Sequence, residues 1–561
     1  MVTNVVKEKQ EILLSIKRIG INGEGIGYYK RLAVFVNNTL PGEECVVRIT
    51  EVNEKYAKAI LVKIKGDKSP YRVEPKCPHY NICGGCQFQH ISYEGQLKYK
   101  KSLVVEAFDR YYDGQLNPVL FKDTIGMDNP WYYRNKAKLP VRYDGKRLVT
   151  GLYAFDSNKL VYVDNCDVEK KDIRACVKDI LSYLTKYQVI AYNPKIRDGV
   201  LRHIVVRSST ATKEIQVTLI LFKKDERTIK IAEGLTSIKN VVSVYISINN
   251  DMDALENFGE NTYLLAGKKT IVEKLGDLSF ELLPTAFFQL NLEQTEKLYN
   301  QVVKSARLKG YEKVIDAYCG VGTIGLFLSK FVKEVRGIDT NEEAINNANN
   351  NVSINNIFNA SFYAGDVLSN ITKWYKKGFE ADVLVVDPPR TGLDLKLINY
   401  LQEHPVKKLI YVSCNPATLA KNCNHLQKKY HILSIQPLDM FPQTSNTETV
   451  VLLSHKSNNS KVNVNLNFDN EKGKKLIKKV VEDVDSRKEP EGASYPEIKE
   501  YILNKYNVKV SSLNIAQIKT KYGIIERECY NKPKSENSRQ PNCTKEKEEM
   551  IVDALKHFKM I

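Results

Sequence analysis

Apolar and polar residues alternate with a period of two over residues 11–65, which is the pattern of strands with one buried face. Turn-forming pairs interrupt the alternation, including Asn22-Gly23, Asn37-Asn38 and Pro41-Gly42. The runs between these turns are ILLSIKRIG, RLAVFVNN, EECVVRITEV and YAKAILVKI. Several short strands within so few residues predict a small β-barrel of the oligonucleotide-binding type.

The pattern changes twice more along the chain. Residues 66–284 begin with a polar, cysteine-dense segment that predicts a loop at residues 76–90, followed by mixed strands and helices of an α+β region. From residue 285 to 456, strand-like runs alternate with helical stretches, which predicts a Rossmann-like α/β domain with a parallel sheet. Its predicted strands are EKVIDAY, EVRGID, ADVLVVD and KKLIYVS, with residues 450–454 closing the sheet.

The remaining residues, 457–561, predict a linker and a basic C-terminal extension. Residues 456–470 are rich in Asn and Ser, as in a linker. Residues 495–506 and 512–522 predict two short amphipathic helices joined by a turn. A helix-turn-helix that contacts nucleic acid and a small interaction domain are both compatible with this pattern.

Composition narrows the class of protein. A chain of 561 residues, 43% hydrophobic and 27% charged, is typical of a soluble protein with several domains. Its net charge of +18 favours a polyanionic partner such as nucleic acid, although a solvated basic surface is the alternative. Residues 1–18 lack a secretory signal, and the longest apolar stretch, 314–332, is a poor membrane span. We expect a cytoplasmic protein without a membrane or obligate protein partner.

A strand, a glycine-containing turn and a helix follow one another in the sequence VIDAYCGVGTIG. Gly320 and Gly322 allow the backbone to approach a bound nucleoside closely, and the helix is predicted to begin near Thr323. The next strand ends at Asp339, where an acid can accept hydrogen bonds from two ribose hydroxyls. The spacing lacks the three-glycine fingerprint of a pyrophosphate site. It favours S-adenosylmethionine over a dinucleotide.

Two further strands place candidate catalytic groups at the same edge of the predicted sheet. Asp387 ends ADVLVVD, directly before two prolines, where open α/β sheets bind ligands, although an ordinary strand-ending turn is the alternative. Cys414 follows KKLIYVS and precedes a predicted helix, whose N-terminus would lower the thiol pKa and favour the nucleophilic thiolate. A buried structural cysteine is the alternative for Cys414.

Five motifs occur in an order that resembles the RNA uracil-5-methyltransferases. They are FFQLN, DAYCGVGTIG, VVDPPRTGLD, YVSCNPATLA and DMFPQTSNTETVVLL. The N-terminal stretch GEGIGYYKRLAVFV similarly resembles a TRAM domain, an RNA-binding barrel. The resemblance runs to about residue 455 and leaves out the C-terminal extension.

This resemblance implies a covalent mechanism and a set of site residues. Cys414 would attack uracil C6, C5 would then take the methyl group, and Glu448 would remove the C5 proton before the thiol leaves. A surface carboxylate is the alternative for Glu448. The residues implied to bind S-adenosylmethionine are Gln289, Tyr318, Gly320, Gly322, Asp339 and Asp387.

Two positions depart from the resembled pattern. Members of that family often carry histidine in the stretch before the catalytic glutamate, where this chain has Gln443-Thr444-Ser445-Asn446. The ribose acid is commonly Glu rather than Asp339. Neither change removes a catalytic group, but roles that belong to those histidines do not transfer to this chain.

Eleven cysteines without a secretory signal suggest a reducing compartment, where clustered cysteines bind metals. Cys77, Cys83 and Cys86 are spaced C-x5-C-x2-C, and Cys166 lies 80 residues further on. Four thiolates can bind zinc or an iron–sulfur cluster. Only one C-x2-C pair is present, so the three-plus-one distribution favours a cluster.

The resemblance to this family also implies the type of cluster and the RNA substrate. The rRNA-modifying branch of the resembled family carries this cysteine pattern with a 4Fe-4S cluster, whereas its bacterial tRNA-modifying branch lacks both the cluster and the TRAM domain. The resemblance therefore implies 23S rRNA as the partner and a structural cluster.

Three alternatives stay open from the sequence. The first is a tRNA uracil-5-methyltransferase. The second is a radical S-adenosylmethionine methylthiotransferase, which would instead have C-x3-C-x2-C and an open iron site. The third is a non-catalytic iron–sulfur RNA-binding protein, against which the intact Cys414, Glu448 and Asp387 argue.

Overall fold

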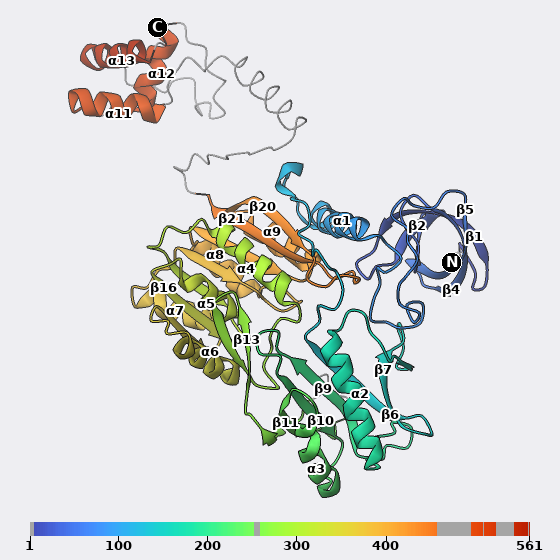
Figure 1. Ribbon diagram of the computed structural model, residues 1–561. Helices are drawn as coiled ribbons and strands as arrows, with labels where there is room; N and C mark the ends of the chain where they lie inside the picture. The colour runs from blue at the N-terminus through green and yellow to red at the C-terminus, as the bar shows by residue number, and fades with distance from the viewer. Residues whose placement is uncertain are drawn as a thin grey trace. The chain divides into compact units, whose positions relative to one another are not determined.

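Figure 1 shows the computed structural model, which describes residues 5–251, 258–456, 495–508, 510–522, 543–558 and 560. The chain divides into two compact units, Met1–Asn459 and Ser460–Ile561. The predicted linker at residues 456–470 lies outside the described residues apart from Lys456. None of the helices in the described ranges is long and apolar enough to cross a membrane.

The alternating N-terminal segment forms a closed five-stranded barrel, which confirms the prediction. Its strands pair in the order β1-β2-β3-β5-β4, with β3 and β5 parallel. Along β1, Ile12, Leu14 and Ile16 are buried inside the barrel, whereas Leu13 is exposed. The strands are β1 (Glu11–Ile19), β2 (Gly25–Tyr29), β3 (Leu32–Val36), β4 (Glu44–Val52) and β5 (Tyr56–Lys65).

A seven-stranded sheet forms the middle of the first unit, in the order β12-β11-β10-β9-β6-β7-β8. Helices α2 (Lys171–Lys186) and α3 (Glu226–Glu233) pack on it, and short turns of 3-10 helix lie at Pro118–Leu120 and Gly234–Ser237. The strands are β6 (Lys136–Tyr143), β7 (Leu148–Tyr153), β8 (Leu160–Tyr162), β9 (Leu201–Ser208), β10 (Ile215–Leu221), β11 (Val241–Ile248) and β12 (Asn261–Gly267).

The cysteine-rich residues 76–90 contain no helix or strand and precede helix α1 (Tyr93–Tyr111). An isolated bridge pairs Cys83 with Ala154, just after β7. The buried face of α1 carries Val104 and Phe108, and it packs in the core of the following α/β domain rather than on the middle sheet. Residues 93–111 therefore belong by packing to the α/β domain.

The second seven-stranded sheet has the order β17-β16-β15-β18-β19-β21-β20. Neighbours from β17 to β19 are parallel, whereas β21 runs antiparallel between β19 and β20. Its strands are β15 (Lys313–Ala317), β16 (Glu334–Asp339), β17 (Ala360–Ala364), β18 (Val383–Val386), β19 (Lys408–Ser413), β20 (Tyr430–Leu438) and β21 (Glu448–His455). The predicted Rossmann-like sheet is confirmed, with β17 and β20 as additional strands.

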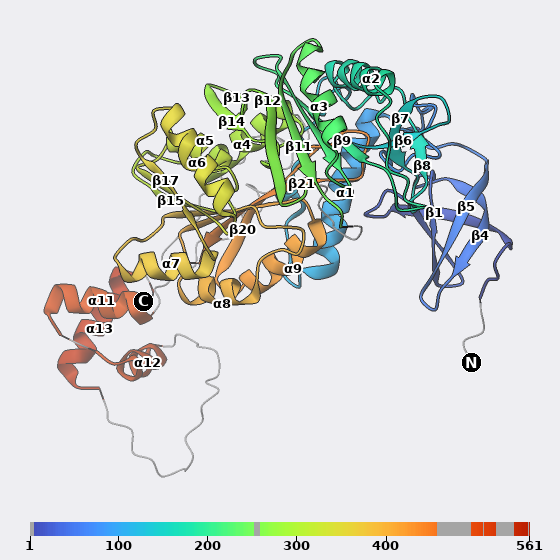
Figure 2. The ribbon, with the colours of Figure 1, turned by 90° about the horizontal axis from the view of Figure 1, so that it is seen from below.

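Two helical layers cover this sheet (Figure 2). Alternate strand residues face the two sides, so that Leu384 and Val386 enter one core while Val383 and Val385 enter the other. One layer contains α7 (Val367–Lys376), α8 (Leu395–Glu403), α9 (Pro416–Leu426) and α1. The other contains α4 (Leu292–Ala306), α5 (Thr323–Ser329), α6 (Glu342–Ile354) and the hairpin β13 (Ile271–Leu275)–β14 (Leu278–Leu282).

The second unit contains helices α11 (Tyr495–Tyr506), α12 (Ser512–Lys521) and α13 (Lys545–His557). Isoleucines from all three helices form its core, including Ile498, Ile515 and Ile551. Helix α13 has no counterpart among the elements predicted from the sequence.

Candidate active site

The turn after β15 places two glycines in the left-handed region, where Gly320 has φ +54° and Gly322 has φ +80°. A Cβ on Gly322 would lie 2.7 Å from Phe362 Cζ, so the close packing of α5 requires this glycine. A Cβ on Gly320 would meet nothing within 4 Å, so the space above that position is open. Tyr318 opens the turn with φ +64° and is half-buried.

Two aspartates fix this turn. Asp339, the last residue of β16, accepts a hydrogen bond at Oδ2 from the Gly320 amide (2.9 Å) and at Oδ1 from the Asn341 amide (2.9 Å). Asp316 in β15 is fully buried and accepts at Oδ2 from the Gly325 amide (2.7 Å). Burial raises the pKa of Asp316 to about 8. Sequence reasoning missed Asp316, although it is the first residue of the motif DAYCGVGTIG.

Asp387 and Glu448 lie at the same edge of the sheet, on the strands that flank β19. Asp387 follows β18, and burial raises the pKa of its carboxyl to about 7. Glu448 begins β21 and is 8% exposed. Burial, followed by the negative charge of Asp387, raises the pKa of Glu448 to about 8, while Arg390 and Lys100 oppose this rise. Both carboxyls are therefore poised to exchange protons near neutral pH.

Cys414 lies directly after β19, and Asn415 caps the following helix α9. The Asn415 side chain accepts hydrogen bonds from the Ala417 amide (3.1 Å) and the Thr418 amide (3.4 Å). The prediction that the helix N-terminus lowers the Cys414 pKa is wrong. Burial raises the pKa of the thiol, and Glu448 raises it further, because these effects outweigh the nearby cation Arg390.

A cavity of about 250 Å³ opens over Cys414. It is lined by residues of α1, of the barrel turn between β1 and β2, and of the loop before Glu448. The lining residues are Ile21, Asn22, Leu103, Arg390, Cys414, Asn415, Pro416, Ser445, Asn446 and Thr447. The site is thus built jointly by the barrel and the α/β domain.

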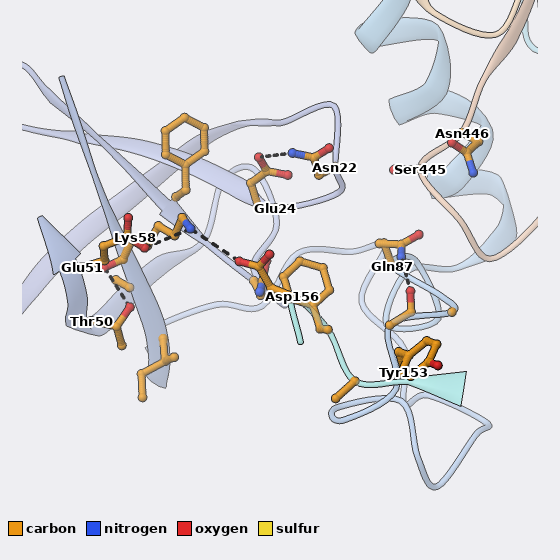
Figure 3. A pocket seen from close by; sticks show the side chains of 18 of the residues that line it. Asn22, Glu24, Thr50, Glu51, Lys58, Gln87, Tyr153, Asp156, Ser445 and Asn446 are labelled. Carbon is orange, nitrogen blue, oxygen red and sulfur yellow. Dashed lines mark hydrogen bonds and ion pairs between the residues drawn. The ribbon is translucent and has the colours of Figure 1, made fainter. Parts of the chain in front are cut away.

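A larger cleft of about 1160 Å³ adjoins this cavity, and Asn22, Arg390, Ser445 and Asn446 line both. Figure 3 shows Asn22 and Glu24 of the barrel facing Ser445 and Asn446, with Tyr153 and Asp156 on a separate segment. The cleft therefore leads from the barrel to the thiol.

Comparison with known proteins identifies the family. Residues 92–456 match the model of the tRNA (uracil-5-)-methyltransferase family, and residues 5–62 match the TRAM domain. The chain belongs to the uracil-5-methyltransferase family. It is 44% identical over 449 residues to an uncharacterized RNA methyltransferase of Bacillus cereus, covering 80% of this chain and 97% of that protein. It is 42% identical over 460 residues to one of Enterococcus faecalis, covering 81% and 100%.

A solved structure supports the same assignment. The tRNA (uracil-54, C5)-methyltransferase of Pyrococcus abyssi, in complex with S-adenosyl-L-homocysteine, matches with a TM-score of 0.62 and 28% identity. The match covers 79% of this chain and 99% of that one, so it is not confined to the catalytic sheet. The present chain is an RNA methyltransferase of the S-adenosylmethionine-dependent uracil-5 family with a TRAM barrel.

In this uracil-5-methyltransferase, a buried ion pair holds the loop that leads to Glu448. Lys100 of α1 pairs with Asp439, and both side chains have no exposed surface. The Lys100 ammonium also donates to the carbonyls of Phe441 (3.2 Å) and Asn446 (2.8 Å). Tyr93 donates its hydroxyl proton to Asp439 Oδ2 (2.9 Å). No sequence signal separates Lys100 from the other lysines of α1.

Lys100→Ala is expected to destabilise the enzyme by about 3–5 kcal/mol, because it leaves the Asp439 carboxylate buried without its cation. Lys101→Ala is the matched control, since Lys101 pairs with the exposed Asp123 and its loss should cost about 0–1 kcal/mol. Chemical denaturation of both variants measures the difference. Equal stabilities would contradict a structural role for the buried pair.

Gln443 lies in the stretch where members of the family often carry histidine, and here it makes hydrogen bonds that join two loops. Its carbonyl accepts hydrogen bonds from the amides of Gln87 (3.0 Å) and Phe88 (2.9 Å), which directly follow Cys86. The Gln443 side-chain carbonyl accepts a hydrogen bond from Gln96 Nε2 (3.0 Å). The backbone amide of Gln443 donates to Gln96 Oε1 (3.0 Å). Gln443 therefore joins the cysteine loop to the loop that carries Glu448.

The remaining predicted cofactor residue, Gln289, precedes α4 and is half-buried. Its backbone carbonyl accepts from Asn135 Nδ2 (3.1 Å), and Asn291 caps α4 through a hydrogen bond from the Gln294 amide (3.4 Å). The chain from β14 to α4 is thus held against Asn135, the residue just before β6 of the middle sheet.

The four predicted metal ligands border one small cavity of about 30 Å³, lined by Cys77, Cys83, Cys86 and Cys166 among others. Within the described residues, no group of three or more His, Cys, Asp or Glu side chains is placed so that it could hold a metal ion.

The raised pKa of Glu448 predicts a pH-dependent cost to folding. A carboxyl whose pKa is about 8 when folded, against an ordinary 4.5, stabilises the folded chain while protonated and loses that contribution as pH rises through about 8. Glu448→Gln should therefore melt close to wild type at pH 5 but clearly higher at pH 8.5. The exposed Glu403→Gln is the control, and a Glu448→Gln advantage that is the same at both pH values would contradict the prediction.

Proposed function

We propose that the protein methylates C5 of a uridine in 23S rRNA, with Cys414 as nucleophile and Glu448 as general base. The observation that carries this proposal is the convergence of Cys414, Glu448 and Asp387, from three adjacent strands, at the end of the sheet where the cavity opens. The strand register places them side by side, because Val386, just before Asp387, pairs with Tyr411 of β19, and Ser413, just before Cys414, pairs with Thr449, just after Glu448.

Uracil C5 is a weak nucleophile, and covalent catalysis overcomes this. The Cys414 thiolate adds to C6, and the electron pair of the C5–C6 bond moves toward the O4 carbonyl as an enolate. C5 of the enolate takes the methyl group that S-adenosylmethionine supplies. Glu448 then accepts the C5 proton, and the electrons of that C–H bond re-form the C5–C6 double bond as the thiolate leaves. The positive charge of Arg390 opposes the rise in the pKa of Cys414 that burial and Glu448 cause, and so stabilises the thiolate at the start and at the end.

The donor site that we propose uses the turn after β15. The open space above Gly320 admits a nucleoside close to the backbone, and Asp339 beside it would accept from the ribose hydroxyls. Gln289, Tyr318, Gly322 and Asp387 complete the proposed set. The charged members of this set are carboxylates, which would repel phosphate groups. The set therefore fits a donor without phosphates.

The RNA reaches Cys414 only if the uridine leaves its stack, because C6 is inaccessible within a helix. The cleft between the barrel and the loop at Ser445 and Asn446 leads to that cavity. The net charge of +18 supports binding through phosphates, with aromatic side chains stacking on bases.

A tRNA substrate is the second candidate, and a specific observation favours it. The protein of Pyrococcus abyssi that this chain matches over 79% of its length acts on tRNA according to its description, so the architecture serves a tRNA enzyme as well. The cysteine pattern supports rRNA. Methyl transfer from labelled S-adenosylmethionine to unmodified 23S rRNA and to unmodified tRNA separates the two. We expect label in rRNA at C5 of uridine, and label in tRNA alone would refute the rRNA proposal.

We further propose that the four cysteines hold a 4Fe-4S cluster with a structural role. The support is that all four cysteines line one cavity, and four thiolates are the donor set that such clusters use. Methyl transfer requires no electron, so the cluster would order the loop that binds Gln443. Anaerobic purification should give about four iron atoms per chain, whereas stoichiometric zinc would refute the cluster.

A further inference from the structure

Two arginines lie near the predicted metal ligands and have buried N–H groups without a hydrogen-bond partner, Arg134 on the four-cysteine cavity and Arg174 on a neighbouring cavity that Cys166 also lines. Arg134 precedes β6 and lines the cavity together with the cysteines. Arg174, in the first turn of α2, is only 8% exposed. Arg174 and Cys166 line the same neighbouring cavity, whereas Arg134 shares the four-cysteine cavity with all four cysteines.

The known partners do not satisfy these groups. Arg174 Nε lies 2.6 Å from Glu169 Oε2, and Arg174 Nη1 donates to the Val163 carbonyl (3.3 Å). Within the part of the chain that the structure describes, Arg174 Nη2 and Arg134 Nε are buried and have no hydrogen-bond partner. Orphaned buried donors on charged groups are rare in native proteins, because a lost hydrogen bond to a charged group is costly.

The charged side chains around the cavity also indicate that an anion is missing there. Glu169 is 2% exposed and interacts with both Arg174 and Arg134, so one carboxylate serves two cations. Asp167, which lines the four-cysteine cavity, pairs with Lys76, so four neutral thiols would leave the two guanidinium groups with the single carboxylate of Glu169. Four thiolates around a cluster would supply the missing anion, because such a centre is negative overall and its sulfurs accept hydrogen bonds.

We infer that Arg134 and Arg174 are positioning residues of the cluster, which donate their free N–H groups to its sulfurs and offset its negative charge. This inference rests on the proposed cluster. Hydrogen bonds to sulfur and nearby cations raise the reduction potential of an iron–sulfur centre, and groups around a metal site commonly govern how tightly the metal is held.

The competing interpretation is that Arg134 and Arg174 only neutralise Glu169. The two roles predict opposite results for Glu169→Gln. If the arginines serve the sulfurs, removing the carboxylate strengthens the positive field on the cluster and shifts its potential upward, whereas Arg174→Gln shifts it downward. If they serve only Glu169, both variants disturb the same structural contact and change the cluster in the same direction.

The experiment uses the full chain purified without oxygen, as wild type, Arg134→Gln, Arg174→Gln, Arg174→Lys and Glu169→Gln. Arg147→Gln is the matched control, because Arg147 is 63% exposed in its side chain and its nearest carboxylate is Asp144 at 3.9 Å. The readouts are iron and sulfide per chain, the rate of iron loss to a chelator, and the reduction potential. Circular dichroism confirms folding, and Arg174→Lys keeps the charge should Arg174→Gln fail to fold.

Arg134→Gln and Arg174→Gln should lose iron about tenfold faster than wild type or more, and their potentials should be more negative. Arg174→Lys should fall between Arg174→Gln and wild type, while Arg147→Gln should match wild type. Loaded Arg134→Gln and Arg174→Gln proteins that match wild type in both readouts would overturn the arginine role alone. A wild type without iron and sulfide would overturn the cluster and this inference together.

Discussion

Cys414→Ala is expected to abolish methyl transfer to RNA, with a loss on the order of 10⁶-fold in turnover, as when another covalent enzyme loses its nucleophile. The reason is chemical, because without sulfur at C6 the ring has no enolate from which C5 can attack. Incorporation of labelled methyl groups into unmodified RNA measures the loss.

Cys423→Ala is the matched control for this variant. Cys423 lies on helix α9, which begins just after Cys414, but it is fully buried in the core and does not border the cavity. Its loss should leave activity close to that of wild type. A Cys414→Ala enzyme that methylates RNA at the wild-type rate would disprove the covalent mechanism.

Glu448→Gln is expected to trap the RNA on the enzyme. Addition of Cys414 and methyl transfer do not require Glu448, but the last step removes the C5 proton, and an amide cannot accept it. Turnover should fall by about 10²–10⁴-fold, while a methylated RNA–protein adduct accumulates. The adduct is measured as RNA that stays with the protein on a denaturing gel.

The double variant Cys414→Ala/Glu448→Gln should show no such adduct, because the covalent bond starts at the sulfur of Cys414. Glu403→Gln, at the exposed end of α8, should behave as wild type. If Glu448→Gln turns over slowly without any adduct, Glu448 acts at an earlier step than proton removal.

Much of the α/β domain could be predicted because buried parallel strands are short apolar runs. The strands β15, β16, β18 and β19 have this character, and their order placed Asp387 and Cys414 at one edge. Strand β17 escaped prediction because it is an edge strand with alternate residues exposed. Strand β20 escaped because Pro437 and several polar residues interrupt its pattern.

The site was predictable in its residue types but not in its electrostatics. A single strand or helix does not reveal how deeply Cys414 and Glu448 are buried, and this burial reverses the expected direction of the thiol pKa. Lys100 and Asp439 lie 339 positions apart in the sequence, so no local pattern links them. Gln443, which seemed only a departure, joins two loops through contacts that the fold creates.

The reversed strand β21 has a consequence for how the enzyme is made. It is inserted between β19 and β20, although both precede it in the chain, so β20 has no neighbouring strand within the sheet until β21 has been synthesised. Because β21 runs backwards, its first residue, Glu448, is the one that reaches the edge of the sheet. A nascent chain that ends before this strand therefore holds its thiol without its base. The reaction centre becomes complete only when the last strand of the sheet has emerged from the ribosome.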